Sequence, residues 1–188
     1  MLKKNPLPRE GAAILVCNHT ASLDPMILQA VTSNRIIVWM MAKEYMNVRG
    51  LGWFFRTLGI ILVERSGKDS GPLRSALREL KKGRVLGVFP EGRITKNHEL
   101  LPFQTGVAMM AIKADVPVYP AYIEGSQRGK DMVEACAMPQ QVTVTFGPAV
   151  QFNRDSTTRE NLEAATAAIK SAIEKLRDEY QAMTKACG

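Results

Sequence analysis

Apolar and polar positions follow two alternating periods along the chain. Six short runs are almost continuously apolar, which is typical of strands buried on both faces. We expect these strands at residues 12–16, 36–41, 59–63, 85–89, 116–123 and 142–146. Several intervening segments space their apolar residues three and four apart, like one face of an amphipathic helix. We expect helices at residues 25–32, 43–58, 69–82, 103–114 and 157–183, the second interrupted by Gly50 and Gly52.

This alternation of strands and helices predicts an α/β fold, with a mixed, largely parallel sheet flanked by helices. The chain has 188 residues, shows no linker or repeat, and is expected to form a single domain over residues 1–188. Its core should cover about residues 11–150, followed by an amphipathic helix over about residues 157–184. Pro117 and Pro120 lack the N–H that a ladder needs, so they predict an edge or irregular strand. Thr157 and Glu160 match a capping box at the start of the last helix.

The first strand runs into a stretch that carries candidate chemistry, residues 16–25. Asp24 and Pro25 resemble a helix start, with Asp24 as N-cap and Pro25 as the first helical residue. His19 then lies in the strand-to-helix loop, where the Asp24 carboxylate can reach one imidazole nitrogen and leave the other to take a proton. The simpler alternative is that Asp24 only caps the helix. Cys17, inside the predicted strand, is better explained as a buried apolar residue than as a nucleophile.

Polar residues also follow two later strands. Glu91, Gly92 and Arg93 come directly after the strand that ends at residue 89, and Arg65 follows the strand at 59–63. The carboxyl ends of parallel strands are where open α/β sheets bind ligands. Glycine lets a ligand approach the backbone, and arginine pairs with phosphate. Turn chemistry and a surface ion pair are the competing interpretations.

Composition limits the class of partner. The formal net charge of +7 is concentrated in residues 1–98, which indicates an anionic partner or simply a solvated basic face. Basic residues are scattered, without the aromatic interleaving of nucleic-acid motifs, so we expect no nucleic acid. The three cysteines and two histidines form no metal-ligand spacing, and the odd cysteine count suggests a reducing compartment.

No apolar stretch reaches the ~18 residues of a membrane span, and no signal peptide is recognised. Both tryptophans, Trp39 and Trp53, and two of the six phenylalanines nevertheless lie within residues 39–55. Such residues commonly form core, but an acyl-chain pocket or a membrane-interface patch is the functional alternative.

Four blocks in one order resemble the glycerolipid acyltransferase family that includes 1-acylglycerol-3-phosphate acyltransferase. They are Asn18-His19-Thr20-Ala21-Ser22-Leu23-Asp24-Pro25, the segment from Gly59 to Arg65, Phe89-Pro90-Glu91-Gly92-Arg93, and Val116-Pro117-Val118-Tyr119-Pro120. The third block departs from the commoner Glu-Gly-Thr-Arg-Ser form, because Arg93 directly follows Gly92. Many members also carry a hydrophobic anchor before the histidine block, where this sequence has about seventeen residues.

The resemblance implies a glycerol-3-phosphate acyltransferase-like fold and transfer of a fatty acyl group from acyl-CoA or acyl carrier protein to 1-acylglycerol-3-phosphate (lysophosphatidic acid), forming phosphatidic acid. His19 would be the general base and Asp24 would orient it, and an ordinary imidazole pKa of ~6.5 suits that task. Arg65 and Arg93 would hold the phosphate, while Glu91 and Gly92 would shape the acceptor site. No metal or cofactor is implied.

The lipid acceptor further implies peripheral association with the cytoplasmic face of an anionic membrane, through the region from Leu51 to Ile61 and the basic first half. Two alternatives stay open. One is another acceptor, such as glycerol-3-phosphate or a lysophospholipid. The other is a non-catalytic basic module that binds lipid.

Overall fold

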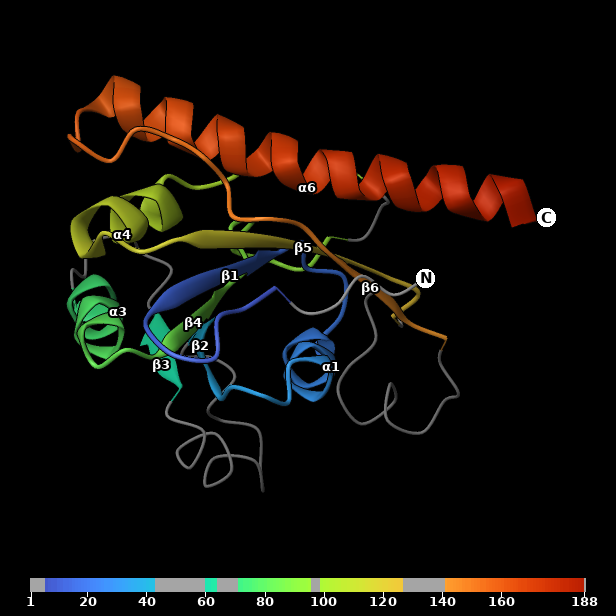
Figure 1. Ribbon diagram of the computed structural model, residues 1–188, viewed down its shortest axis with the longest axis horizontal. Helices are drawn as coiled ribbons and strands as arrows, with labels where there is room; N and C mark the ends of the chain where they lie inside the picture. The colour runs from blue at the N-terminus through green and yellow to red at the C-terminus, as the bar shows by residue number, and fades with distance from the viewer. Residues whose placement is uncertain (1–5, 43–59, 64–70, 96–98, 127–140, 188) are drawn as a thin grey trace.

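The computed structural model describes residues 6–42, 60–63, 71–95, 99–126 and 141–187, which build a six-stranded sheet (Figure 1). Its strands are β1 (Ala13–Cys17), β2 (Ile37–Ala42), β3 (Ile61–Val63), β4 (Val85–Val88), β5 (Val118–Glu124) and β6 (Thr143–Phe146). They lie in the order β3-β2-β4-β1-β5-β6. Neighbouring strands are parallel except β5 and β6, which are antiparallel. The expected mixed, largely parallel α/β sheet is therefore confirmed.

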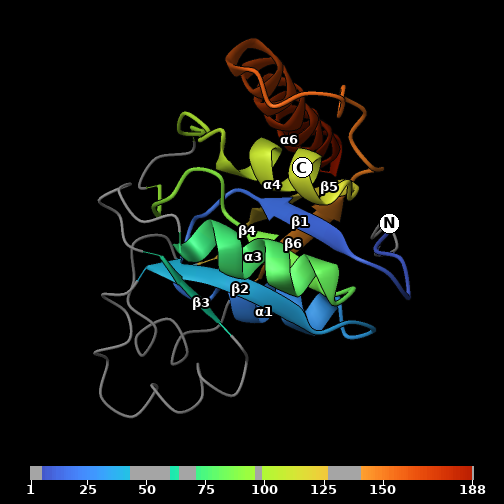
Figure 2. The same cartoon turned by 90° about the vertical axis from the view of Figure 1, so that its left-hand side faces the viewer.

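The described helices cover both faces of the sheet. They are α1 (Asp24–Val31), α3 (Gly71–Lys81), α4 (Gly106–Ala114) and α6 (Arg159–Cys187). Helices α3, α4 and α6 lie on one face, and α1 lies on the other (Figures 1 and 2). Two hydrophobic clusters follow this division, since α1 contributes Leu28 to one cluster and the other three helices contribute to the second.

Strand β1 lies inside the sheet, between β4 and β5. All five of its residues are buried. Ile14 and Val16 pack into the cluster beneath α3, α4 and α6, whereas Leu15 and Cys17 pack into the cluster that contains Leu28 of α1. Burial on both faces is the physical reason for its uninterrupted apolar run.

Helix α6 packs across the sheet beside β5. Its buried residues Ile169, Ile173 and Leu176 follow helical spacing, so the expected amphipathic helix is confirmed. It runs to Cys187 rather than to residue 183. None of the described helices is both long enough and apolar enough to cross a bilayer.

The prediction that β5 is an edge or irregular strand was wrong, because β5 pairs with both β1 and β6. The β5–β6 ladder can contain Pro120 because of where this residue lies along it. Its carbonyl accepts the N–H of Gly147 at 2.9 Å, just beyond the last β6 residue, Phe146. A residue in a strand points its N–H and C=O to the same side. The position at which Pro120 lacks an N–H therefore faces Gly147, which lies beyond the end of β6, so no bond of the β5–β6 ladder is lost.

Three predicted helix starts were also wrong. Helix α1 is capped by Leu23, so Asp24 is the first helical residue and not the N-cap. Helix α4 begins at Gly106 rather than at residue 103, since Leu101 and Gln104 donate their backbone N–H groups to Glu91 and Pro90. The capping box at the start of α6 is displaced as well. Helix α6 begins at Arg159, and Thr158, not Thr157, accepts the N–H of Asn161 at 3.4 Å.

Several expectations fall outside the described residues. They are the helix at 43–58, Trp53, most of the proposed membrane-docking region from Leu51 to Ile61, and Arg65 with its flanking residues. Of the docking region, Ile60 and Ile61 are described. Ile61 is buried in the larger core cluster, and Ile60 packs partly buried against the smaller one.

Candidate active site

The candidate site lies at the carboxyl ends of two adjacent strands, β1 and β4. His19 follows β1, and Glu91 follows β4. The helix after β1 is on one face of the sheet and the helix after β4 is on the other (Figure 1). The two loops therefore diverge to opposite faces, which is the arrangement that opens ligand crevices in α/β sheets.

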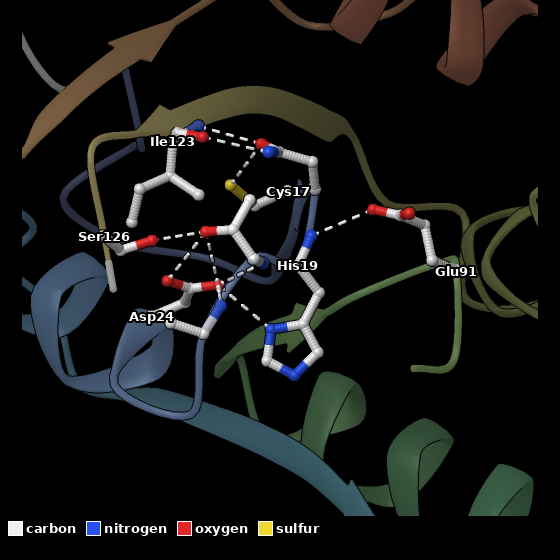
Figure 3. Close-up of polar contacts among 9 residues, drawn as sticks. Cys17, His19, Asp24, Glu91, Ile123 and Ser126 are labelled. Atoms are coloured by element: carbon white, nitrogen blue, oxygen red, sulfur yellow. Dashed lines mark hydrogen bonds and ion pairs between the residues drawn. The ribbon is translucent and has the colours of Figure 1, made fainter. Parts of the chain in front are cut away.

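His19 and Asp24 face each other across the turn between β1 and α1 (Figure 3). The distance from His19 Nδ1 to Asp24 Oδ2 is 3.0 Å. Asp24 is fully buried, whereas 16% of the His19 side chain is exposed. Nε2 lies on the far side of the ring from Asp24 and has no hydrogen-bond partner among the described residues. The paired histidine and carboxylate expected from their spacing are thus brought together.

The Asp24 carboxylate is surrounded by donors from the same turn. Oδ2 accepts the backbone N–H of Thr20 at 2.6 Å and of Ala21 at 2.8 Å. The Thr20 hydroxyl lies 3.3 Å from each carboxylate oxygen. Because the carboxylate receives these N–H donors, it acts as an acceptor toward Nδ1. The proton of the neutral imidazole then lies on Nδ1, and the lone pair lies on Nε2.

A buried pair of hydroxyl groups lies behind Asp24. Thr20 Oγ1 contacts Ser126 Oγ, which belongs to the loop after β5. Both residues are buried. This contact joins the β1–α1 turn to a loop 106 residues away. Neither residue was predicted, because serine and threonine are common in loops and local sequence does not indicate which of them meet.

Asn18 holds the end of β1 against β5. Its Nδ2 donates to the carbonyl of Ile123 at 2.9 Å, and its Oδ1 accepts the N–H of Ile123 at 2.8 Å. The last paired residues of the two strands are Cys17 and Ala121. The amide side chain therefore continues the ladder by one step while the main chain turns toward His19. Asn18 is part of the first sequence block, but the sequence alone does not indicate this role.

Glu91 links the loop after β4 to His19. Its Oε1 accepts the backbone N–H of His19 at 2.9 Å, and its Oε2 accepts the N–H of Leu101 at 2.9 Å. The residue is 4% exposed. On the other side of His19, Thr95 donates its N–H to the His19 carbonyl at 2.8 Å. These two contacts of Glu91 are with backbone N–H groups; a direct contact with the acceptor stays a prediction.

Gly92 and Arg93 lie between these two anchors. Gly92 has φ +69°, which favours glycine, and a Cβ there would come within 2.8 Å of Gln104 Nε2. Arg93 is exposed. Since Glu91 and Thr95 both bond to His19, the base of the Arg93 side chain lies two residues from each anchor. Arg93 therefore belongs to a loop segment that is tied at both ends to the His19 backbone, and its role in phosphate binding stays a prediction.

Cys17 lies next to the site but does not have the character of a nucleophile. Burial raises the pKa of its thiol well above 9.0, and the nearby carboxylates of Asp24 and Glu91 raise it further. The interpretation of Cys17 as a small buried apolar residue fits this environment.

Several known proteins are similar to this chain in sequence. The chain is 25% identical over 175 residues to 1-acyl-sn-glycerol-3-phosphate acyltransferase of Bacillus subtilis, covering 93% of this chain and 86% of that protein. It is 30% identical over 120 residues to the Escherichia coli protein of the same name, covering 60% of this chain and 47% of that protein. The chain thus spans most of the first relative and less than half of the second.

Among solved structures, the fold is similar to that of the 1-acyl-sn-glycerophosphate (LPA) acyltransferase PlsC from Thermotoga maritima. The TM-score is 0.68 at 23% identity, over 93% of this chain and 70% of that chain. This likeness concerns the fold. Residues 2–124 match the family described as Acyltransferase, and this range holds all four sequence blocks together with His19, Asp24 and Glu91. The chain belongs to the acyltransferase family.

Proposed function

We propose that this acyltransferase moves a fatty acyl group from an acyl thioester, acyl-CoA or acyl carrier protein, to the free hydroxyl of 1-acylglycerol-3-phosphate, and so forms phosphatidic acid. The observation that carries the proposal is the His19–Asp24 pair, with a buried carboxylate on Nδ1 and a part-exposed ring. The names of the Bacillus subtilis and Escherichia coli relatives support the choice of acceptor.

In the proposed step His19 is the general base. Nε2 takes the proton of the acceptor hydroxyl as its oxygen attacks the thioester carbonyl carbon. The new C–O bond forms and the C–S bond breaks, and the proton passes from Nε2 to the departing sulfur. Asp24 keeps Nδ1 protonated and stabilises the imidazolium that forms between the two transfers. The step uses no acyl-enzyme, which agrees with the buried Cys17 thiol, and it requires no metal or cofactor.

The acceptor's phosphate is assigned to Arg93, with Arg65 as the second cation. Arg93 is exposed and lies between two residues that bond to the His19 backbone. A guanidinium matches a phosphate in a bidentate geometry. This assignment requires that a phosphate bound to Arg93 leave the glycerol hydroxyl within reach of the imidazole. Because the acceptor is a lipid, we expect the enzyme to work peripherally at the cytoplasmic face of an anionic membrane.

The experiment is an acyl-transfer assay on liposomes that carry lysophosphatidic acid, with acyl-CoA and acyl carrier protein thioesters as donors. Replacing His19 by alanine removes the base, so we expect turnover to fall by on the order of a thousandfold or more. The other histidine of the chain, His98, offers the matched control, and His98→Ala should keep wild-type turnover. Full activity in His19→Ala would refute the mechanism.

An acceptor panel tests the substrate. It includes glycerol-3-phosphate, lysophospholipids with larger head groups and a neutral monoacylglycerol. A marked preference for the neutral acceptor would remove the phosphate role from Arg65 and Arg93. Binding to anionic vesicles that falls with salt, without any product and without sensitivity to His19→Ala, would favour the non-catalytic lipid-binding alternative.

A further inference from the structure

Three aromatic rings from three adjacent strands form a continuous stack that ends on the His19 imidazole. The ring centroids of His19 and Phe89 are 4.0 Å apart, with 15° between the planes. Those of Phe89 and Trp39 are 5.1 Å apart, with 14° between the planes. Trp39 belongs to β2, Phe89 follows β4 and His19 follows β1. The order β2-β4-β1 in the sheet places Phe89 between the other two.

Gly87 leaves the space in which Trp39 lies. It is the residue of β4 that pairs with Trp39 of β2. A Cβ at Gly87 would come within 2.4 Å of Trp39 Cε3 and 2.7 Å of Ile37 Cγ2. Trp39 and Ile37 are both almost fully buried, so neither side chain can move away easily. Because residues 87 and 89 point to the same face of the strand, the indole that covers Gly87 meets the ring of Phe89.

The stack supplies a restraint that Asp24 alone does not. The hydrogen bond to Asp24 holds Nδ1 of the imidazole, and the bond to Cβ holds Cγ. Small coupled changes of χ1 and χ2 can still tilt the ring about the line through these two atoms, and Nε2, on the opposite side, then moves most. A second ring lying nearly parallel at 4.0 Å opposes this tilt, because tilting loses the stacking contact. Proton transfer depends on the direction of the Nε2 lone pair.

We propose that Phe89 is a positioning residue for His19, supported from behind by Trp39 in the space that Gly87 leaves. The inference rests on the proposed function, in which His19 is the base. Phe89 touches neither the proton nor the thioester in this assignment; it sets the plane of the ring that does. Trp39 acts through its ring face, which stacks on Phe89. Its indole N–H has no acceptor among the described residues.

The kinetic test compares Phe89→Leu with Phe89→Tyr, which keeps the ring. We expect Phe89→Leu to lower kcat by on the order of tenfold while KM for acceptor and donor stays within about twofold, since an aromatic pair contributes on that scale. Phe89→Tyr should retain most of kcat. Gly87→Ala should reproduce part of the Leu effect by displacing Trp39. Thermal unfolding checks that each variant is folded, and the two Phe89 variants decide the matter if Gly87→Ala does not fold.

The second readout is independent of activity. In a His98→Gln background, His19 is the single histidine, so nitrogen NMR of the labelled imidazole reports its tautomer and mobility directly. We expect one Nδ1-protonated form with sharp signals both in the parent protein and in Phe89→Tyr. In Phe89→Leu, Asp24 still holds the proton on Nδ1, but the ring moves, so we expect exchange-broadened imidazole signals.

Two results would overturn the inference. One is unchanged kcat in folded Phe89→Leu. The other is a raised KM with unaltered imidazole signals, because Phe89 would then contact substrate instead. If the unmodified enzyme transfers no acyl group to any acceptor, the proposed function fails, but the imidazole signals still show whether Phe89 holds the ring.

Discussion

Replacing Glu91 by glutamine separates two roles that this residue could have. The carboxylate accepts one backbone N–H on each oxygen, from His19 and from Leu101, at 2.9 Å in both cases. Glutamine has nearly the same shape but offers one acceptor oxygen and one NH₂ group. Whichever way the amide is turned, one backbone N–H faces another donor. The substitution therefore breaks one of the two links without creating a cavity.

The magnitude follows from these two bonds. A hydrogen bond to a charged group contributes about 1.5–3 kcal/mol, against about 0.5–1.5 kcal/mol for a neutral pair. Losing one such bond and weakening the other lowers the free energy of unfolding by roughly 2–4 kcal/mol. Domains are typically stable by about 5–15 kcal/mol, so the variant should still fold at 25 °C. Its kcat should fall as well, because the His19 backbone loses one of its anchors.

The assay is denaturant unfolding followed by circular dichroism, together with steady-state kinetics on lysophosphatidic acid. Glu163→Gln is the matched control. Glu163 is an exposed residue of α6 that pairs with Arg159, and its replacement should change stability by less than about 1 kcal/mol. Suppose instead that Glu91→Gln unfolds at the wild-type denaturant concentration and raises only the KM for the acceptor. Glu91 would then bind substrate, and the backbone role would be wrong.

Two of three further predictions concern residues near the site, and the third concerns the distant pair of Lys82 and Glu79. Asn18→Leu should lower the free energy of unfolding by at least about 2 kcal/mol in the same unfolding assay, because the buried N–H and C=O of Ile123 both lose their partner; wild-type stability would contradict this. Gly92→Ala should cost about 1 kcal/mol, since φ is +69°, and unchanged stability would show that the turn relaxes. The hydrogen bond from Lys82 holds the pKa of Glu79 in the folded protein below its ordinary value of 4.5. The ionised carboxylate therefore stabilises the fold above pH 4.5, and this stabilisation is lost as the pH falls through the lower pKa of the folded protein. Wild type should therefore lose more stability than Glu79→Gln on acidification below about pH 4.5, and parallel stability profiles would contradict the assignment.

The strands were predictable because the sheet is buried on both faces. Each buried strand leaves an apolar run in the sequence, and β1 shows this most clearly, with every residue buried. Helix starts were less predictable because local capping signals competed with distant contacts. Asp24 looks like an N-cap, but its carboxylate serves the turn before the helix. Residues 103–105 look helical, but the backbone around them bonds to the loop after β4.

The contacts of the candidate site also fall into those that the sequence predicts and those that it does not. The pairing of His19 with Asp24 could be predicted, because the two residues are five positions apart across a single turn, close enough for their side chains to meet. The contacts of Glu91, Ser126 and Ile123 with residues 18–20 could not, since these partners lie 72 to 106 residues away. The stack of Phe89 on His19 belongs to this second group. It depends on the sheet order, which places β4 beside β1.

The bond between Asn18 and Ile123 has a consequence for how activity is acquired. It spans 105 residues, so the loop that carries His19 is not held in place until the fifth strand has joined the first. Contacts of such sequence separation form slowly. Recovery of catalysis during refolding should therefore coincide with the slowest structural phase, and a nascent chain that has not yet emerged past residue 123 should be inert.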